Sequence, residues 1–276
     1  MTRIVRAAPA LAGAALLLIV LATTVEGHYL QIEWQATAVP LAWWYAADVA
    51  GTVAVPAFLG AVGLGLGGLA DRPLADVLRT RVAPNLTWYA VSVSATLIVL
   101  WRLGPVYGLP PVRDLPELLR LLLLPPTGLA LTYALALFPL LAWTARGLPR
   151  PLLVAAAVTL AVVAGVAAAR NPTWATAAGL TRNLLFFLVG WHLAVPAHPV
   201  AGALAAVGRA AAPIAALALP ATAAVGGALV RRLSALDGPL QILAAVAEPV
   251  LVVALVVVAG LAGHRWRARV PRPVTR

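Results

Sequence analysis

Eight stretches of the chain are long and apolar enough to cross a bilayer, and loops separate them, of which all but the first contain arginine. Lipid offers backbone N–H and C=O groups no hydrogen-bond partners, so only helices and closed barrels span it. A helical span needs about 20 consecutive apolar residues, and these runs have helix length rather than strand length. The sequence therefore predicts an all-α, polytopic membrane bundle of about eight transmembrane helices.

The predicted spans have boundaries good to a few residues. They cover Ala8–Val25, Leu41–Leu69, Pro84–Leu103, Thr127–Ala145, Pro151–Ala169, Thr181–Pro196, Pro213–Val230 and Leu240–Gly263. The second is longer than a bilayer requires, so we expect it to begin in the interface at Trp43–Tyr45 and to kink at Pro56. In the proline-rich segment Gly104–Pro126, we expect a short interfacial helix over Leu115–Leu124.

Composition supports one membrane domain. Apolar residues make up 62% of the chain and charged residues 11%, against roughly 45–50% and about 25% in soluble domains. No polar segment is long enough to fold separately, so we expect a single domain over 1–263 and a basic cytoplasmic tail over 264–276. The first run has no persuasive small-residue cleavage site before Glu26, which favours a retained helix over a signal peptide.

The distribution of arginine predicts the orientation. With a cytoplasmic N-terminus, the predicted cytoplasmic side holds thirteen arginines: Arg3, Arg6, Arg72, Arg79, Arg81, Arg146, Arg150, Arg209, Arg265, Arg267, Arg269, Arg272 and Arg276. The outer side then holds seven: Arg102, Arg113, Arg120, Arg170, Arg182, Arg231 and Arg232. Because cytoplasmic loops of membrane proteins are enriched in positive charge, both termini are predicted to be cytoplasmic.

Several classes of partner are excluded at this stage. The chain has no cysteine, and its four histidines are too far apart to suggest a metal site. The formal charge of +11 comes from loop arginines that meet anionic lipid headgroups, and no basic polar surface exists to bind nucleic acid. Arginine without lysine, together with abundant Ala, Gly and Pro, indicates GC-rich coding. We therefore expect a multi-pass protein of a bacterial inner membrane.

Four short motifs occur in a recognisable order. They are Pro56–Gly63 (PAFLGAVG), Arg79–Pro84 (RTRVAP), Leu131–Leu135 (LTYAL) after Pro125 and Pro126, and Asn183–Gly190 (NLLFFLVG). In this order the motifs resemble those of the acyltransferase-3 family of polytopic membrane acyltransferases. The resemblance is divergent and covers about Asp48–Leu193. It implies transfer of an acyl group from a cytoplasmic donor such as acyl-CoA to a hydroxyl of an envelope saccharide or lipid.

The resemblance also suggests functional residues. Family members carry a first-helix histidine thought to be catalytic, and His28 is the candidate here for a base that deprotonates the acceptor hydroxyl. Its alternative role is that of a solvated interfacial histidine. Arg79 and Arg81 are candidates for binding the phosphates of acyl-CoA, because guanidinium groups donate bidentate hydrogen bonds. The positive-inside rule explains the same two arginines without a ligand.

The sequence departs from the family pattern at three places. The family's first-helix arginine and histidine are about three turns apart, whereas Arg6 and His28 are 22 positions apart, or roughly 33 Å along a helix. Arg79 and Arg81 are separated by one residue rather than two. The chain also ends after its eighth predicted span, where the family continues with two more helices. A non-catalytic relative, acting as a scaffold or partner subunit, is therefore the main alternative, and a small-molecule transporter is the third.

Two acidic residues fall inside predicted spans. Asp48 follows the aromatic residues of the second span, and Glu248 lies within the last span. An ionised acid in a membrane helix usually faces a cavity or a basic partner. We therefore expect Asp48 and Glu248 to take part in the site, with Arg182 or Arg209 as the partner of Glu248. The glycine-rich run Gly60–Gly68 lacks the strand that a nucleotide-binding loop requires, so it predicts close helix packing instead.

Overall fold

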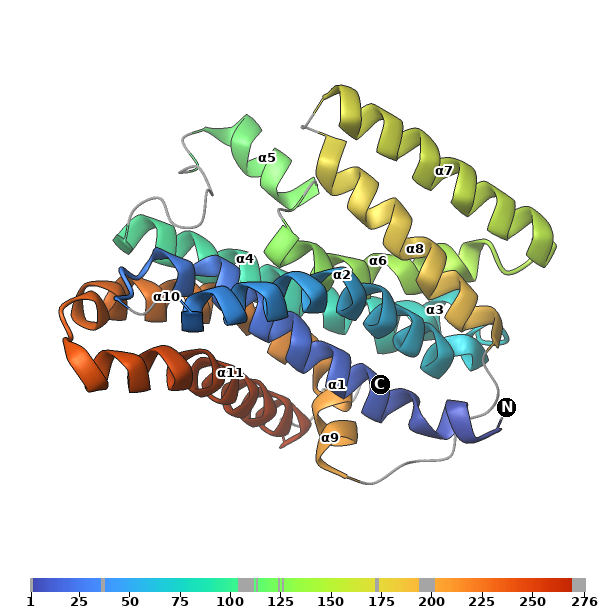
Figure 1. Ribbon diagram of the computed structural model, residues 1–276. Coiled ribbons are helices and arrows are strands. Elements are labelled where there is room, and N and C mark those ends of the chain that lie inside the picture. The colour runs from blue at the N-terminus through green and yellow to red at the C-terminus, as the bar shows by residue number, and fades with distance from the viewer. Residues whose placement is uncertain are drawn as a thin grey trace.

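The computed structural model describes residues 2–35, 38–103, 112, 114–123, 125, 127–171, 174–193 and 202–269. The side chains of residues 2–7, 103, 120, 127, 128, 268 and 269 are not described. Helices dominate the described residues, and no strand occurs among them. The predicted all-α class is confirmed (Figure 1).

Long helices form the body of the molecule. They are α1 (Thr2–Gly27), α2 (Ala38–Leu66), α4 (Ala83–Leu103), α6 (Thr127–Thr144), α7 (Arg150–Arg170), α8 (Ala175–Leu193), α10 (Ala211–Ser234) and α11 (Gly238–Arg269). Shorter helical segments join them: η1 (Tyr29–Gln31), η2 (Gly67–Leu69), α3 (Leu74–Val77), the π-helical turn η3 (Leu78–Val82), α5 (Leu115–Leu123) and α9 (Ala203–Arg209).

Six segments among the described residues are long and apolar enough to cross a membrane. They contain α1, α2, α4, α7, α10 and α11, and they confirm a polytopic membrane bundle. The predicted fourth span is a shorter apolar helix within α6. The predicted sixth span is α8, which is more polar because it carries Arg182 and Asn183; its predicted end, 194–196, lies outside the described residues.

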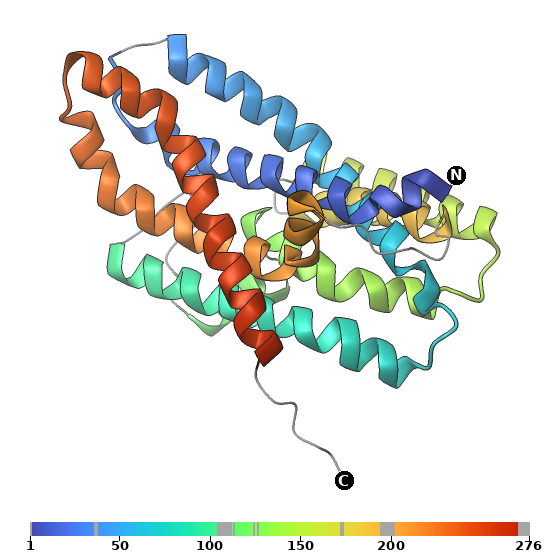
Figure 2. The same ribbon diagram turned by 90° about the horizontal axis from the view of Figure 1, so that it is seen from below.

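Helix α1 lies at the centre of the bundle. It packs against α2, α9, α10 and α11, and α10 in turn contacts α4, α6 and α11. Seen from below, α11 runs obliquely across the bundle (Figure 2). Helix α8 packs between α2 and α7, and α7 lies at the edge of the molecule (Figure 1). The helix that carries His28 at its end is therefore enclosed by four others.

The outer helices turn apolar side chains away from the bundle. On α7 these include Leu152, Val162 and Val163, and on α11 they include Leu251 and Val258, each more than half exposed. In water such a surface would be costly, whereas hydrocarbon accommodates it. The exposed faces of α7 and α11 thus fit a bundle surrounded by lipid.

Glycines allow two pairs of helices to approach closely. A Cβ atom at Gly63 of α2 would overlap the carbonyl oxygen of Phe187 in α8, and one at Gly190 would overlap that of Gly60. Small residues bring helix backbones together in this way in membranes. The predicted packing role is confirmed for Gly60 and Gly63, whereas Gly65 and Gly68 face open space. Two of the motifs identified in the sequence therefore meet at this crossing.

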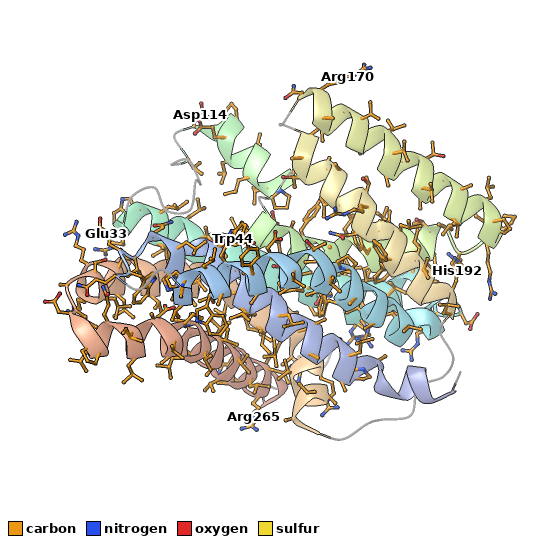
Figure 3. All side chains as sticks on the ribbon, viewed as in Figure 1. Glu33, Trp44, Asp114, Arg170, His192 and Arg265 are labelled. Atoms are coloured by element: carbon orange, nitrogen blue, oxygen red, sulfur yellow. The ribbon has the colours of Figure 1, made fainter. Side chains whose placement is uncertain are left out.

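One end of the bundle gathers segments predicted to be cytoplasmic. The indole of Trp143 donates to the carbonyl of Arg72 (2.8 Å), and Arg267 donates to the carbonyl of Pro84 (3.2 Å). Figure 3 shows His192 at this end and Glu33 at the opposite end. The predicted loops alternate between the two ends. Which end faces the cytoplasm follows only from the charge rule.

Other predictions concern the loops and the tail. Helix α5 confirms the predicted short helix: Leu115, Leu119 and Leu123 are exposed on it, whereas Leu121 and Leu122 pack against a small core around Tyr89. Helix α11 continues past Gly263 to Arg269, so the predicted tail is helical at its start. Other residues named in the sequence predictions lie outside the described residues: Gly104, Arg113, Leu124, Pro126, Arg272 and Arg276.

Candidate functional site

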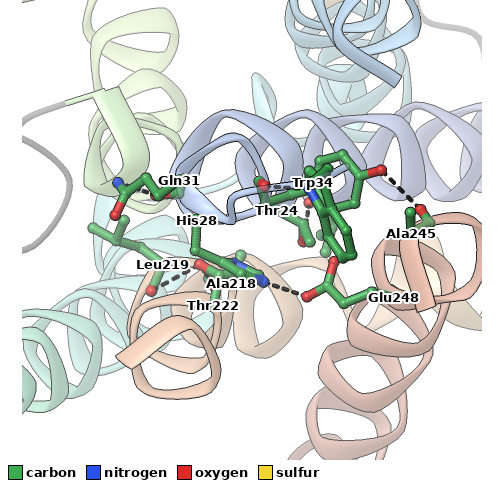
Figure 4. A network of polar contacts seen from close by, with 12 residues as sticks. Thr24, His28, Gln31, Trp34, Ala218, Leu219, Thr222, Ala245 and Glu248 are labelled. Atoms are coloured by element: carbon green, nitrogen blue, oxygen red, sulfur yellow. Dashed lines mark hydrogen bonds and ion pairs between the residues drawn. The ribbon is translucent and has the colours of Figure 1, made fainter. Parts of the chain in front are cut away.

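His28 and Glu248 form a buried hydrogen-bonded pair between α1 and α11. His28 follows the last residue of α1 and is 1% exposed, and Glu248 is 6% exposed. Nε2 of the histidine contacts Oε1 of the glutamate (Figure 4). The structure thus joins two of the predicted catalytic residues. The alternative of a solvated interfacial His28 is wrong, because the ring is enclosed by protein.

The segment after α1 is fastened to the α10–α11 hairpin by hydrogen bonds. The hydroxyl of Tyr29 donates to the carbonyl of Ala245 (2.8 Å). The amide of Gln241 donates to the carbonyl of Glu33 (3.0 Å) and accepts from the backbone N–H of Gln35 (2.8 Å). These contacts fix the residues that follow His28 and the residues that precede Glu248 on α11. They therefore hold His28 against α11. Figure 4 shows the ring lying over Ala218 and Thr222 of α10 and pointing towards Glu248.

The hydrogen bond assigns roles to the two ring nitrogens. With Glu248 as a carboxylate, Nε2 must carry the proton that is donated to it, so a neutral ring has its lone pair on Nδ1. Among the described residues, neither Nδ1 of His28 nor Oε2 of Glu248 has a hydrogen-bond partner. A histidine oriented by a carboxylate, with one free basic nitrogen, is an arrangement that serves general acid–base catalysis.

A cavity of about 710 Å³ lies beside the pair, among α1, α2, α6, α8 and α10. Its volume is in the range typical of small-molecule sites. Polar side chains line it from α1 (Glu26), from η1 (Gln31) and from α8 (Arg182 and Asn183). His28 itself does not line the cavity, but Gly27 beside it does. One layer of residues therefore separates the pair from the cavity.

Asp48 lies apart from the His28–Glu248 pair. Its side chain is exposed on α2. Its carboxylate repels the carboxylate of Glu26 on α1. Asp48 does not line the cavity. The expectation that Asp48 and Glu248 share one site is therefore not met.

Arg79 and Arg81 lie in η3, at the end of the bundle opposite to His28. Both side chains are exposed, and neither lines the cavity. Helix α2 alone, which connects the two ends, is about 40 Å long at the rise of an α-helix. The two arginines therefore cannot contact a group bound at His28.

Arg182 occupies a different place from the predicted one. The sequence places it at the outer end of the sixth predicted span, one position after the span begins, whereas the structure places it inside α8, seven positions after Ala175. It lines the cavity rather than pairing with Glu248. Arg209, the other predicted partner, lies in α9. Glu248 is paired with His28 instead, because the end of α1 reaches α11 at this level.

Gln241 and Tyr29 support the pair but are not predicted from the sequence. Gln241, Ala245 and Glu248 are spaced at i, i+4 and i+7, which puts them on one face of α11. Such a spacing of two polar residues in an otherwise apolar helix is a signal that sequence reasoning can use. It shows that Glu248 faces inward, but it does not reveal the partner from α1.

Comparisons with known proteins leave this geometry as the basis for function. No family model, no curated protein and no solved structure matches the chain.

Proposed function

We propose that the protein is a membrane acyltransferase that moves an acyl group to a hydroxyl of an envelope saccharide or lipid. His28 acts as the general base on the acceptor hydroxyl, and Glu248 is a positioning residue that orients the ring. The observation that carries the proposal is the buried His28–Glu248 pair beside a cavity of about 710 Å³. The motif resemblance over Asp48–Leu193 supports the same class of reaction.

The cavity offers groups suited to acyl transfer. The attack of a hydroxyl on an acyl carbonyl develops negative charge on the carbonyl oxygen, and hydrogen-bond donors stabilise that charge. The guanidinium of Arg182 and the amide of Asn183 are donors in the lining. His28 takes the hydroxyl proton at Nδ1, which has no partner among the described residues. Because His28 does not line the cavity, the acceptor hydroxyl has to pass Gly27 to reach this nitrogen.

The donor is proposed to be acyl-CoA, with Arg79 and Arg81 binding its phosphates. Both arginines are exposed in η3 and are free to form bidentate contacts. Because they lie at the end opposite to His28, the acyl arm has to pass between the helices to reach the cavity.

This separation favours a second candidate, a non-catalytic scaffold or partner subunit. The contacts at Gly63 and Gly190 hold the backbones of α2 and α8 together, so no ligand passes between the two helices at this crossing. A scaffold needs the helical frame and the pair, but it needs no path from Arg79 to His28.

The location is proposed to be the cytoplasmic membrane of a bacterium, with both termini inside. The hydrogen bonds from Trp143 to Arg72 and from Arg267 to Pro84 gather arginine-rich segments at one end. That end faces the cytoplasm under the positive-inside rule.

A transfer assay with the purified protein in lipid nanodiscs tests the proposal. Labelled acetyl-CoA is supplied with a lipid extract and a set of saccharides, and acyl transfer is measured. We expect His28→Gln to lower kcat at least a hundredfold, since a positioned base typically contributes 10²–10⁴. Arg79→Gln and Arg81→Gln are expected to raise KM for acetyl-CoA with little change in kcat.

The matched control is His264→Gln, because His264 is exposed on α11, far along the helix from Glu248. It should leave turnover at the wild-type rate. A folded wild-type protein that transfers no acyl group to any acceptor contradicts the acyltransferase and favours the scaffold.

A further inference from the structure

Arg182, whose side chain is exposed, brings a permanent charge into the lining of the cavity. It precedes Phe186 by one helical turn, and the carbonyl of Phe186 lies 3.6 Å from the Cβ position of Gly60 in α2. This places the start of its side chain near the middle of α2 rather than at the edge of the membrane. Charged residues within a membrane bundle usually mark a ligand or ion path.

Among the described residues, no acidic side chain forms an ion pair with Arg182. The ion pair within the described residues joins His28 to Glu248, and Arg182 has no counterpart of that kind among them. The nearest acid in the cavity is Glu26, which lines it from α1 without reaching Arg182. A cation on one wall and an acid on another therefore face the same space.

Asn183, the next residue, has an unsatisfied acceptor. Asn183 lines the cavity, and its Oδ1 is buried with no hydrogen-bond partner among the described residues. A buried acceptor without a partner is costly. A ligand that donates a hydrogen bond, such as a hydroxyl, would satisfy it.

Apolar side chains form much of the rest of the cavity. Leu16 and Val20 of α1, Leu59 of α2 and Leu131 of α6 line it away from Glu26 and Gln31. On α1 the apolar lining residues precede the polar Thr23 and Glu26, so the lining becomes more polar towards the end of the helix. This gradient matches a molecule with a polar head and a hydrocarbon tail.

We propose that the cavity binds an anionic amphiphile that carries hydroxyl groups. Its phosphate or carboxylate pairs with Arg182, a hydroxyl donates to Asn183 or Glu26, and its hydrocarbon chain lies against Leu16, Leu59 and Leu131. The inference deepens the proposed function, on which it rests only in taking this ligand as the acyl acceptor. Binding itself does not depend on catalysis.

Thermal stabilisation of the purified protein in a neutral detergent tests the inference, since a ligand that binds the folded state raises Tm with concentration. Dioctanoyl phosphatidylglycerol supplies a phosphate, hydroxyls and tails. Sodium decanoate supplies a carboxylate and a tail, glycerol phosphate has no tail, and dioctanoylglycerol has no charge. We expect phosphatidylglycerol to bind most tightly. Glycerol phosphate and dioctanoylglycerol should each bind at least tenfold more weakly than phosphatidylglycerol. The binding of decanoate shows whether a carboxylate can take the place of the phosphate in the cavity.

Arg182→Gln should weaken binding of phosphatidylglycerol at least tenfold, and Arg182→Lys should retain most of it because the charge remains. The matched control is Arg170→Gln at the exposed end of α7, which should bind as the wild type does. Size-exclusion chromatography confirms that each variant is folded.

Two results overturn the inference. One is equal binding by Arg182→Gln and the wild type, which means that the lipid binds only around the outside of the bundle. The other is equal binding of dioctanoylglycerol and phosphatidylglycerol, which means that the cavity does not recognise the charge of the phosphate. Binding through Arg182 without acyl transfer overturns the proposed function alone, and transfer without binding through Arg182 overturns this inference alone.

Discussion

Gly63 of α2 lies so close to Phe187 of α8 that a Cβ atom would overlap the phenylalanine carbonyl oxygen and approach the backbone nitrogen of Trp191 to 2.9 Å. Backbone atoms cannot turn aside as a side chain can. We therefore expect Gly63→Ala to destabilise the protein by about 1–3 kcal/mol, the usual cost of overpacking. The loss of folded protein on heating, followed by size-exclusion chromatography, measures it.

The control for this prediction is Gly65→Ala, two residues along the same helix, where no atom lies within 4 Å of the Cβ position. It should be neutral or slightly stabilising, because alanine favours helix more than glycine does. Equal stability of the two variants would show that α2 and α8 do not approach as described.

The pairing of His28 with Glu248 predicts strong coupling between the two residues. Removing one partner of a buried pair leaves the other polar group uncompensated, at a cost of about 3–5 kcal/mol. We expect His28→Leu and Glu248→Leu each to lose this much stability, and the double variant to lose far less than the sum. A double-mutant cycle on thermal stability measures the coupling.

Exposed charges should behave differently from this pair. Asp48→Asn, on the exposed face of α2, is expected to change Tm very little, because it removes only a repulsion from Glu26. Additive effects of the two leucine substitutions, or a large loss at Asp48, would contradict the assignment of the site.

Filling the cavity should block its ligand without unfolding the protein. Gly179 of α8 lines the cavity, and no atom lies within 4 Å of its Cβ position. We expect Gly179→Phe to abolish the stabilisation by dioctanoyl phosphatidylglycerol and to leave Tm without lipid near that of the wild type. Gly165→Phe on α7, which also faces open space, is the control. Undiminished binding by Gly179→Phe would place the lipid elsewhere.

The absence of cysteine makes the orientation easy to test. Gln35 and Arg146 are exposed at opposite ends of the bundle. In intact cells we expect a membrane-impermeant maleimide to label Gln35→Cys and to spare Arg146→Cys until the membrane is opened. The reverse pattern would invert the topology and put the arginine-rich end outside.

Most of the fold can be predicted from the sequence because lipid leaves the backbone few choices. The apolar runs that predict α1, α7 and α11 act locally, and a helix in hydrocarbon satisfies its own hydrogen bonds. The short helix α5 follows from leucines alternating with Glu117 and Arg120. The least accurate prediction concerns α8, which begins at Ala175, six positions before the predicted span. Arg182 and Asn183 resemble residues at the end of a span, whereas the structure places them inside the helix beside the cavity.

The site is harder to predict because its parts come from distant segments. His28 and Glu248 are separated by 220 positions, and a single sequence contains no signal that joins them. A charge-based search favours arginine as the partner of a buried acid, and so it points to Arg182 and Arg209. The correct partner depends on how far α1 reaches before it ends at Gly27, which only packing determines.

The pair between the first helix and the last also constrains how the protein is made. His28 leaves the ribosome long before Glu248, so it has to wait in the nascent, partly inserted chain without its carboxylate. The α10–α11 hairpin completes the assembly when it docks onto the segment around Tyr29. If synthesis stops before α11, His28 stays unpaired and is not covered by that helix. We expect quality-control proteases to recognise such an incomplete chain by its uncovered histidine.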